Sequence, residues 1–259
     1  MNYFFKALIY IIISLVIFIL LKTILLFQIE ERELAPNVLD LAHRGYASIY
    51  EESSLEAFTY AIHSKTDGLE FDVRQTLDEV LVINHNRIIN GIYIENSIFS
   101  DLNKSNNILR LKDILILAKR TNTKVWIEIK DSYLYPNIIE NILELLKNES
   151  FENNTIIQSF NLDDLVYIHE RNHEIKLLKL FIYYNNNDLL PTYIDYVGIP
   201  IVFTIFNLNS IKILHKLGFK VIVWRESSFF ETNYILSKLI SLGVDGFMIN
   251  KPLKDFIAK

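Results

Sequence analysis

The sequence predicts an α/β fold, a (β/α)₈ TIM barrel preceded by one N-terminal transmembrane helix. Two observations carry this prediction. Short apolar runs alternate with amphipathic stretches from Val38 onward, and the segment before them is long and apolar. The chain has 259 residues, so about 220 remain for the barrel, enough for one domain with a well-buried core.

Residues 1–29 contain the segment that we expect to anchor the chain in a membrane. Its uncharged centre, residues 7–21, lies between Lys6 and Lys22. A span needs about 20 residues, and Lys22 can extend its ammonium to the headgroups so that the helix continues beyond it. A cleaved signal peptide and a buried helix are the alternatives. No pair of small residues marks a cleavage site after the segment, which favours an uncleaved anchor.

The charges near this segment bear on orientation. Lys6 and the terminal amine precede it, whereas Arg32 follows it among acidic residues, which count for little in the positive-inside rule. We expect a single-pass membrane protein whose C-terminal domain is extracytoplasmic. Residues 30–37 are expected to form a linker and residues 38–259 the barrel domain.

Composition excludes several function classes. The net charge of −5 argues against nucleic-acid binding, which needs a basic face to meet phosphates. The chain has no cysteine, which excludes disulfides, zinc–thiolate sites and thiol nucleophiles.

Nine apolar runs rich in Val, Ile and Phe have the length of buried strands. Helical patterns lie between most of them, and one of these helices is expected to begin with a capping box of Ser53 and Glu56. Strict alternation of strand and helix favours a parallel sheet. The predicted strands are 38–42, 68–73, 80–84, 125–129, 155–159, 176–182, 196–203, 220–224 and 245–249.

A (β/α)₈ barrel has eight places for these nine runs. We expect the surplus run within residues 176–203. Only residues 74–79 separate the second and third runs, too few for a helix, so one βα unit is expected to lack its helix. A doubly wound open sheet is the alternative, but no glycine-rich phosphate loop follows an early strand.

Polar side chains gather at the carboxyl ends of the first four runs, and in a barrel these ends converge on one face. Glu70 and Asp72 stand two apart on a strand, so their side chains point to the same side, and Glu128 adds a third carboxylate. The group consists of His43, Arg44, Glu70, Asp72, His85, Glu128 and Lys130.

Three carboxylates packed together repel one another, and a divalent cation relieves that repulsion. Oxygen ligands suit Ca²⁺ or Mg²⁺ better than zinc or copper. A cation beside Arg44 and Lys130 would bind a phosphate ester, and the imidazoles of His43 and His85 can move protons near neutral pH.

Six blocks follow one another along the chain: LAHRGYASIYEESSLEAF, GLEFDVRQTLDEVLVINHN, WIEIK, IIQSF, VIVW and LGVDGFMINKP. They cover residues 41–252. In this order they resemble the signature blocks of the glycerophosphodiester phosphodiesterase family. The resemblance implies a (β/α)₈ barrel with a small insertion, residues 87–107, and metal-dependent hydrolysis of glycerophosphodiesters to glycerol 3-phosphate and an alcohol.

Roles follow from the resemblance. In such enzymes a free glycerol hydroxyl attacks phosphorus, and water then opens the resulting cyclic phosphate. Matching positions imply that His43 is the general base and His85 the general acid. The implied metal ligands are Glu70, Asp72 and Glu128, the cation being Ca²⁺ or Mg²⁺, and the implied substrate-binding residues are Arg44, Lys130 and Trp224.

The chain departs from the family pattern in three places. Glu51 to Ser54 replace the usual Pro-Glu-Asn-Thr, Asn86 replaces an aspartate after the second histidine, and Ile249 to Pro252 replace Thr-Asp-x-Pro. These departures bear on the catalytic efficiency of the protein and on its choice of substrate. The alternatives are a lysophospholipase D-type activity on membrane lysolipids, and a non-catalytic barrel that binds phosphate esters.

Overall fold

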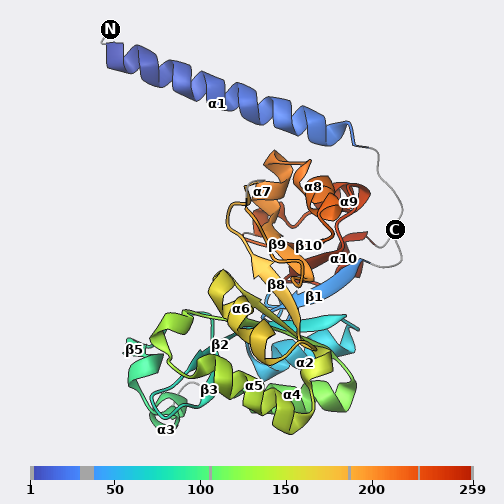
Figure 1. Cartoon of the computed structure of the whole chain (residues 1–259). Coiled ribbons are helices and arrows are strands. Elements are labelled where there is room, and N and C mark those ends of the chain that lie inside the picture. Colours follow the sequence, from blue (N-terminus) through green and yellow to red (C-terminus); the bar gives the residue numbers. More distant parts are fainter. Residues whose placement is uncertain (1–2, 30–37, 105–106, 186–187, 227, 258–259) are drawn as a thin grey trace.

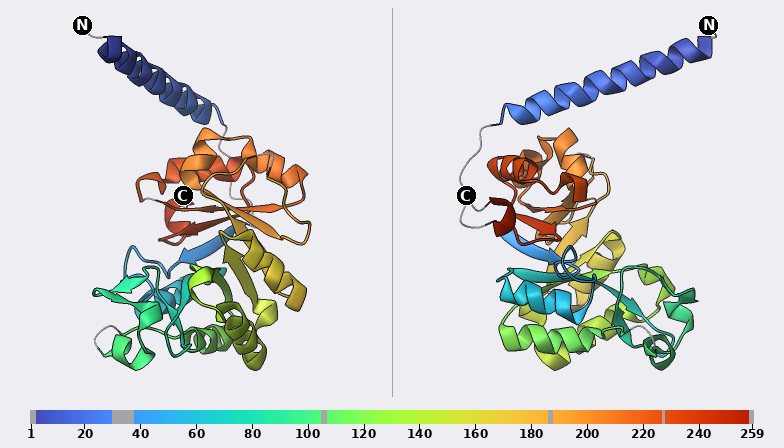
Figure 2. Two further views of the ribbon diagram at one scale, coloured as in Figure 1. Left: turned by 60° about the vertical axis from the view of Figure 1, so that its left-hand side comes forward. Right: turned by 180° about the vertical axis from the view of Figure 1, so that it is seen from behind.

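The computed structural model describes residues 3–29, 38–104, 107–185, 188–226 and 228–257, and the predicted linker of residues 30–37 lies outside these ranges. Eight parallel strands close into a barrel in the order β1-β11-β10-β9-β8-β7-β6-β2, and β1 pairs with β2 to complete the ring. Figure 1 shows the barrel with its helices on the outside, and Figure 2 shows it from two further sides. The predicted barrel is confirmed.

The barrel strands lie close to the predicted runs. They are β1 (Leu39–His43), β2 (Gly68–Gln75), β6 (Lys124–Ile129), β7 (Thr155–Ser159), β8 (Lys176–Leu180), β9 (Tyr196–Pro200), β10 (Lys220–Trp224) and β11 (Gly246–Ile249). The surrounding helices are α2 (Leu55–His63), α4 (Leu111–Thr121), α5 (Ile138–Glu149), α6 (Leu162–Arg171), α7 (Ile201–Phe206), α8 (Ser210–Lys216), α9 (Asn233–Ser241) and α10 (Lys254–Ile257). Short 3₁₀ turns are η2 (Ser132–Leu134), η3 (Glu152–Asn154) and η4 (Ser228–Phe230).

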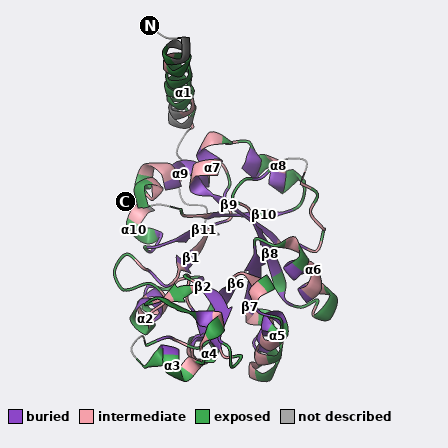
Figure 3. Cartoon of the chain, turned by 90° about the vertical axis from the view of Figure 1, so that its left-hand side faces the viewer, coloured by how far each residue is buried: buried purple, intermediate pink, exposed green. Residues whose placement is uncertain are grey.

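Both faces of the barrel strands are buried, which explains why the strands read as apolar runs rather than alternating ones. Inside the ring, a layer that includes Leu41, Trp126 and Tyr196 fills the lumen, with the Trp126 and Tyr196 rings 5.0 Å apart. Outside the ring, a larger apolar cluster packs the strands against the helices. Figure 3 shows the buried strands at the centre and the exposed outer faces of the helices.

The surplus strand is β3 (Leu81–Ile83), not a run within residues 176–203, so that prediction is wrong. β3 runs antiparallel to β2, with Val73 opposite Ile83. A parallel partner needs a crossover of about a dozen residues, whereas the five residues between β2 and β3 fit only a tight reversal. Thr76 closes that reversal through its N–H, which donates to the carbonyl of Val80 at 3.0 Å. The crossover from β2 to β6 has its helix, α4, whereas the described residues between β8 and β9, 181–185 and 188–195, form no helix. One unit thus lacks its helix, but not the one that the sequence predicted.

Two boundaries also differ from prediction. The run 196–203 is a strand only to Pro200, where α7 begins, because proline readily precedes a helix and cannot donate to a sheet. The cap of α2 is Ser54 rather than Ser53, and its hydroxyl accepts from the N–H of Ala57 at 3.1 Å.

The described part of the predicted insertion of residues 87–107, namely 87–104 and 107, forms a small lobe beside the barrel. It contains β4 (Ile88–Ile89), β5 (Ile92–Tyr93), η1 (Ile94–Asn96) and α3 (Phe99–Asn103). A separate apolar cluster of Val82, Ile94, Leu102 and Ile108 attaches the lobe to β3.

The N-terminal helix α1 (Tyr3–Phe27) stands apart from the barrel in Figure 1, and its described apolar side chains are largely exposed. It touches α7, where Phe18 stacks on Phe206 with ring centroids 6.0 Å apart. Within the described residues, no helix is both long enough and apolar enough to cross a membrane. The transmembrane span expected over residues 1–29 therefore lacks support there.

Asp40 on β1 predicts a pH-dependent part of the stability. Burial raises the pKa of its carboxyl from 3.8 to about 6, although its Oδ2 accepts from the N–H of Leu253 at 2.8 Å. The folded state thus binds this proton more tightly than the unfolded chain. The stabilisation is fully present below about pH 4 and is lost as the pH rises through about 6, by at most about 3 kcal/mol.

We expect the difference in free energy of unfolding between the natural protein and Asp40→Asn to change over this range, because the amide cannot titrate. Urea titrations at several pH values measure it. Parallel curves for the two proteins would contradict the assignment.

Candidate active site

The turn after β1 places His43 and Arg44 at the carboxyl end of the barrel. Arg44 and Gly45 both have left-handed backbone angles, with φ of 53° and 70°. A Cβ on Gly45 would lie 2.6 Å from the Cβ of Ala57 in α2, so only glycine fits between the turn and the helix. The Arg44 carbonyl accepts from the N–H of Ser53 at 2.8 Å, which closes the loop.

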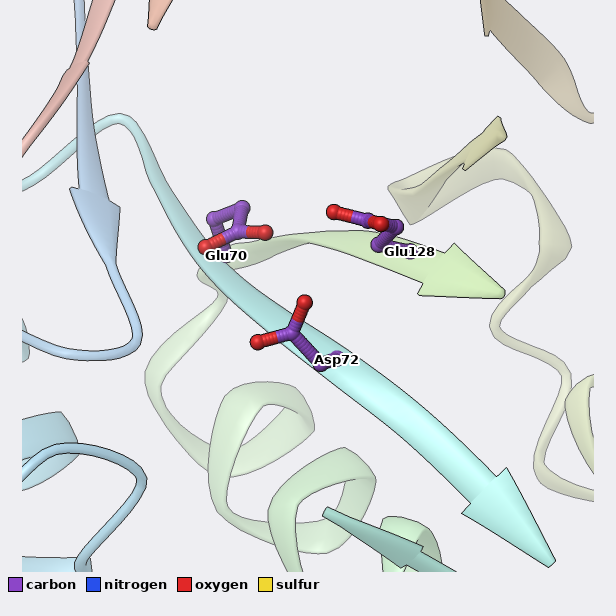
Figure 4. Close-up of side chains that lie close together, drawn as sticks. All are labelled: Glu70, Asp72 and Glu128. Atoms are coloured by element: carbon purple, nitrogen blue, oxygen red, sulfur yellow. The ribbon is translucent and has the colours of Figure 1, made fainter. Parts of the chain in front are cut away.

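Three buried carboxylates form the centre of the site. Glu70 and Asp72 lie on β2 and Glu128 on β6, where Asp72 and Glu128 are direct partners in the sheet register. One ligand atom from each lies within 4.8 Å of the others, and their exposed fractions are 1%, 1% and 7%. Figure 4 shows the three side chains gathered over the two strands.

Two cationic side chains contact this carboxylate cluster. The Lys130 ammonium lies 3.1 Å from Oδ1 of Asp72 and 2.5 Å from Oε1 of Glu128. Nε of Arg44 lies 3.1 Å from Oδ2 of Asp72, and its Nη1 lies 3.0 Å from Oε2 of Glu52. Two cations therefore face three buried carboxylates, and the negative charge is only partly compensated.

Glu70 is held by neutral donors. Nε2 of Gln158 donates to its Oε1 at 2.8 Å, and the N–H of Arg44 donates to its Oε2 at 3.1 Å. Gln158, on β7, is fully buried. Sequence reasoning missed Gln158, because a single glutamine in an apolar strand gives no signal until the barrel brings it to a residue 88 positions away.

The pKa values reflect this crowding. Burial, together with the charges of Asp72 and Glu128, raises the pKa of Glu70 well above its usual range. Burial and the charge of Asp72 raise the pKa of Glu128 to about 7. Burial also acts to raise the pKa of Asp72, but Lys130 and Arg44 outweigh it and hold that pKa below its usual range.

The cluster fits a hard divalent cation. Oδ2 of Asp72 and Oε1 of Glu128 are buried, and each faces one cation, Arg44 or Lys130. A carboxylate has about four lone-pair sites, so each group can bind a metal ion as well. With Glu70 they offer an all-oxygen ligand set, the kind that Ca²⁺ and Mg²⁺ prefer. Added positive charge would also favour ionised Glu70 and Glu128.

The two histidines lie near the cluster, with His43 opposite Glu70 in the register of β1 and β2. Both carry charge interactions with Asp72. Nδ1 of His43 lies 2.7 Å from Oδ1 of Asn250, and burial, with the charge of Arg44, lowers the pKa of His43 to about 3. Nδ1 of His85 lies 3.3 Å from Oδ1 of Asn86, and burial lowers its pKa as well.

The backbone at His85 is anchored from the barrel wall. Nε and Nη2 of Arg74 donate to the carbonyl of His85 at 3.2 and 2.8 Å, and Nη1 of Arg74 pairs with Asp131 at 2.8 Å. These contacts fix the segment after β3 although His85 does not end a barrel strand. The expectation that four successive barrel strands deliver the site is thus corrected to β1, β2 and β6 with an anchored loop.

Trp224 lies at the end of β10 and is linked to the site through one aromatic ring. Its ring centroid is 5.9 Å from that of Phe160, in an edge-to-face arrangement. The Lys130 ammonium lies 5.9 Å from the Phe160 centroid. Phe160 was not singled out from the sequence, since its position beside Lys130 depends on the closure of the barrel.

A cleft of about 810 Å³ opens next to these groups. Glu52, the partner of Arg44, and Asn84, the neighbour of His85, both line it. Ile89 of the insertion and Ile108, which follows the insertion, form part of its wall. The arrangement offers a cation site, two imidazoles and two cationic side chains beside an open cleft. These groups can bind an anionic ester and transfer protons to and from it.

Known proteins resemble this chain in sequence and fold. The model of the glycerophosphoryl diester phosphodiesterase family matches residues 43–254. A glycerophosphodiester phosphodiesterase of Bacillus altitudinis is 28% identical over 158 residues, which cover 54% of this chain and 64% of that relative. One from Caldanaerobacter subterraneus subsp. tengcongensis is 27% identical over 243 residues, covering 83% and 95%. The chain thus spans less than two thirds of the first relative and nearly all of the second.

A solved structure with the same fold is a phosphodiesterase of Oleispira antarctica in complex with the product sn-glycerol-3-phosphate. It superposes with a TM-score of 0.72 at 19% identity, covering 87% of this chain and 96% of that chain.

We predict that Ca²⁺ or Mg²⁺ stabilises the protein through the carboxylate cluster. At a hundredfold excess over the dissociation constant, one bound cation would add about 2.7 kcal/mol to the free energy of unfolding. Glu128→Gln should lose most of this gain, because it removes a charged ligand at constant volume. Thermal unfolding with and without cation, after treatment with chelator, measures it.

Asp164→Asn is the matched control, since Asp164 is a buried carboxylate on α6 that bonds Ser132 and Ser159 instead. An equal cation-induced gain in both variants would contradict the site.

Proposed function

The chain belongs to the glycerophosphoryl diester phosphodiesterase family, and on that premise we propose that it hydrolyses glycerophosphodiesters to glycerol 3-phosphate and an alcohol. One observation carries the proposal: Glu70, Asp72 and Glu128 form one buried cluster, and His43 and His85 both interact with the charge of Asp72 in it. A metal-binding centre and two proton carriers are what cleavage of a phosphodiester needs.

The phosphate would bind to positive charge on both sides. A Ca²⁺ or Mg²⁺ ion held by the carboxylate cluster would supply a Lewis acid for the phosphate oxygens. Arg44 is already oriented by Asp72 and Glu52, so its guanidinium is held at the site before substrate arrives. Lys130 lies on the opposite side of Asp72 and adds a second positive charge for the developing negative charge.

The two histidines divide the proton transfers. We propose that His43 takes the proton of a free glycerol hydroxyl as its oxygen bonds to phosphorus, and that His85 gives a proton to the departing alcohol oxygen. A cyclic glycerol phosphate results. Water then opens it with the roles reversed, so that the second step restores both imidazoles to their starting protonation.

A lysophospholipid is the second candidate substrate. One observation favours it: α1 exposes apolar side chains around its length, which would bring the barrel to a lipid surface. The aromatic pair of Phe160 and Trp224 at the mouth would then lie against the substituents of the glycerol.

We predict that the full-length protein releases glycerol 3-phosphate from glycerophosphocholine in the presence of Ca²⁺ or Mg²⁺, and that chelator stops the release. His43→Ala and His85→Ala should each lower kcat by roughly 10²- to 10⁴-fold, because each removes one proton transfer. A coupled enzymatic assay for glycerol 3-phosphate measures these rates. Lysophosphatidylcholine would give lysophosphatidic acid and choline, so an assay for released choline compares the two substrates.

His173→Ala is the control, since His173 is exposed and packs against His169 on the outside of the barrel. Binding of phosphate esters without turnover under either cation would overturn the proposal in favour of a non-catalytic barrel.

We further propose that α1 attaches the protein to a membrane and that the barrel faces the outside of the cell. The support is the exposure of the apolar side chains of α1, which water solvates poorly. The support for the outward orientation is the basic residue Lys6 before the apolar segment.

We predict that the full-length protein stays with the membrane fraction after an alkaline carbonate wash, and that protease added to intact cells degrades the barrel. Immunoblotting of the fractions measures both. Recovery in the soluble fraction before the wash would contradict attachment, and protection from protease would contradict the outward orientation.

A further inference from the structure

The side chain of Asn250 contacts the imidazole ring of His43. Asn250 follows β11, and only 7% of its surface is exposed. Its side-chain Oδ1 lies 2.7 Å from Nδ1 of His43, across 207 positions of sequence. The distance is that of a short, well-formed hydrogen bond.

The main chain of Asn250 is fixed on both sides. Its N–H donates to Oε1 of Glu231 at 3.0 Å, and Glu231 is in turn paired with Nε of Arg225 at 3.1 Å. Its carbonyl accepts from the hydroxyl and the N–H of Ser48, at 2.7 and 3.3 Å. The side chain therefore starts from a rigid anchor, and its amide is held against one edge of the His43 ring.

A carbonyl oxygen can only accept a hydrogen bond, so the bond to Oδ1 requires a hydrogen on Nδ1 of His43. In the neutral ring the lone pair is then on Nε2. We infer that Asn250 is a positioning residue that holds His43 in the Nδ1–H tautomer and leaves Nε2 ready to take a proton. The inference rests on the proposed function, in which His43 is the base.

Within the part of the chain that the structure describes, the ring of His85 has no equivalent anchor. Nδ1 of His85 lies 3.3 Å from Oδ1 of Asn86, its own neighbour in the chain, which is long for a hydrogen bond that must fix a tautomer. The two rings are therefore held differently. The His43 ring is fixed by a short hydrogen bond and is suited to accept the first proton, whereas the His85 ring is held by a longer contact.

An amide rather than a carboxylate suits this position. Glu231 already contacts the main chain of Asn250, and the negative charge of Asp72 already acts on the His43 ring. A buried aspartate would add one more negative charge to this region, whereas the amide supplies the acceptor without charge. Asn250 stands where the family that this chain resembles usually has aspartate, and its amide oxygen keeps a hydrogen-bond acceptor at that position.

The test measures the tautomer directly. The full-length protein labelled with ¹⁵N-histidine should show the NMR signature of a protonated Nδ1 and an unprotonated Nε2 for His43, with the signals assigned from a His43→Gln variant. Asn250→Leu should lose this signature and lower kcat by roughly 10- to 100-fold with little change in KM, because part of the proton transfer is lost while the phosphate groups still bind.

Asn250→Asp should keep the Nδ1–H signature and most of kcat, since a carboxylate oxygen also accepts a hydrogen bond from Nδ1. This variant keeps the test informative if Asn250→Leu does not fold. Ser48→Ala is the matched control, because it removes a hydrogen bond to the Asn250 main chain and none to the ring. An unchanged tautomer and kcat in Asn250→Leu would overturn the inference, as would an Nε2–H tautomer in the natural protein. A protonated Nδ1 in a protein that does not cleave glycerophosphodiesters would refute the proposed function and leave the positioning role intact.

Discussion

The repulsion among three buried carboxylates is the constraint on which the site depends. Glu70, Asp72 and Glu128 are removed from water by the barrel wall, and their ligand atoms lie within 4.8 Å of one another. Among the described residues, Arg44 and Lys130 are the basic side chains paired with them. Burial of incompletely compensated charge is unfavourable, and the raised pKa values of Glu70 and Glu128 express that strain. A divalent cation bound there would relieve it, which connects the electrostatics of the fold to the proposed reaction.

The barrel supplies the geometry for this cluster through ordinary strand rules. Residues two apart on β2 share a side, and the parallel register places Glu128 beside Asp72, so the carboxylates meet without any special loop. These rules are also why the sequence could predict most of the cluster. It predicted the strands, the shared side of Glu70 and Asp72, and the convergence of the carboxyl ends of the strands. Alternation of apolar runs and amphipathic helices was enough to predict the eight-stranded ring.

Other features depend on contacts that no local pattern reports. Strand β3 has the composition of a barrel strand, and only the short reversal at Thr76 makes it antiparallel. Gln158 and Asn250 reach Glu70 and His43 across 88 and 207 positions, so their roles exist only once the ring is closed. The N-cap of α2 shifted by one residue because Ser53 adopts a left-handed backbone angle in the loop beside Arg44.

The central claim is that these three carboxylates close around a single ion. Anomalous diffraction from crystals of the protein soaked in Mn²⁺, a scattering substitute for Mg²⁺ or Ca²⁺, tests it most directly. We expect one strong peak bonded by carboxylate oxygens of Glu70, Asp72 and Glu128. A peak elsewhere in the barrel, or none at these side chains, would contradict it.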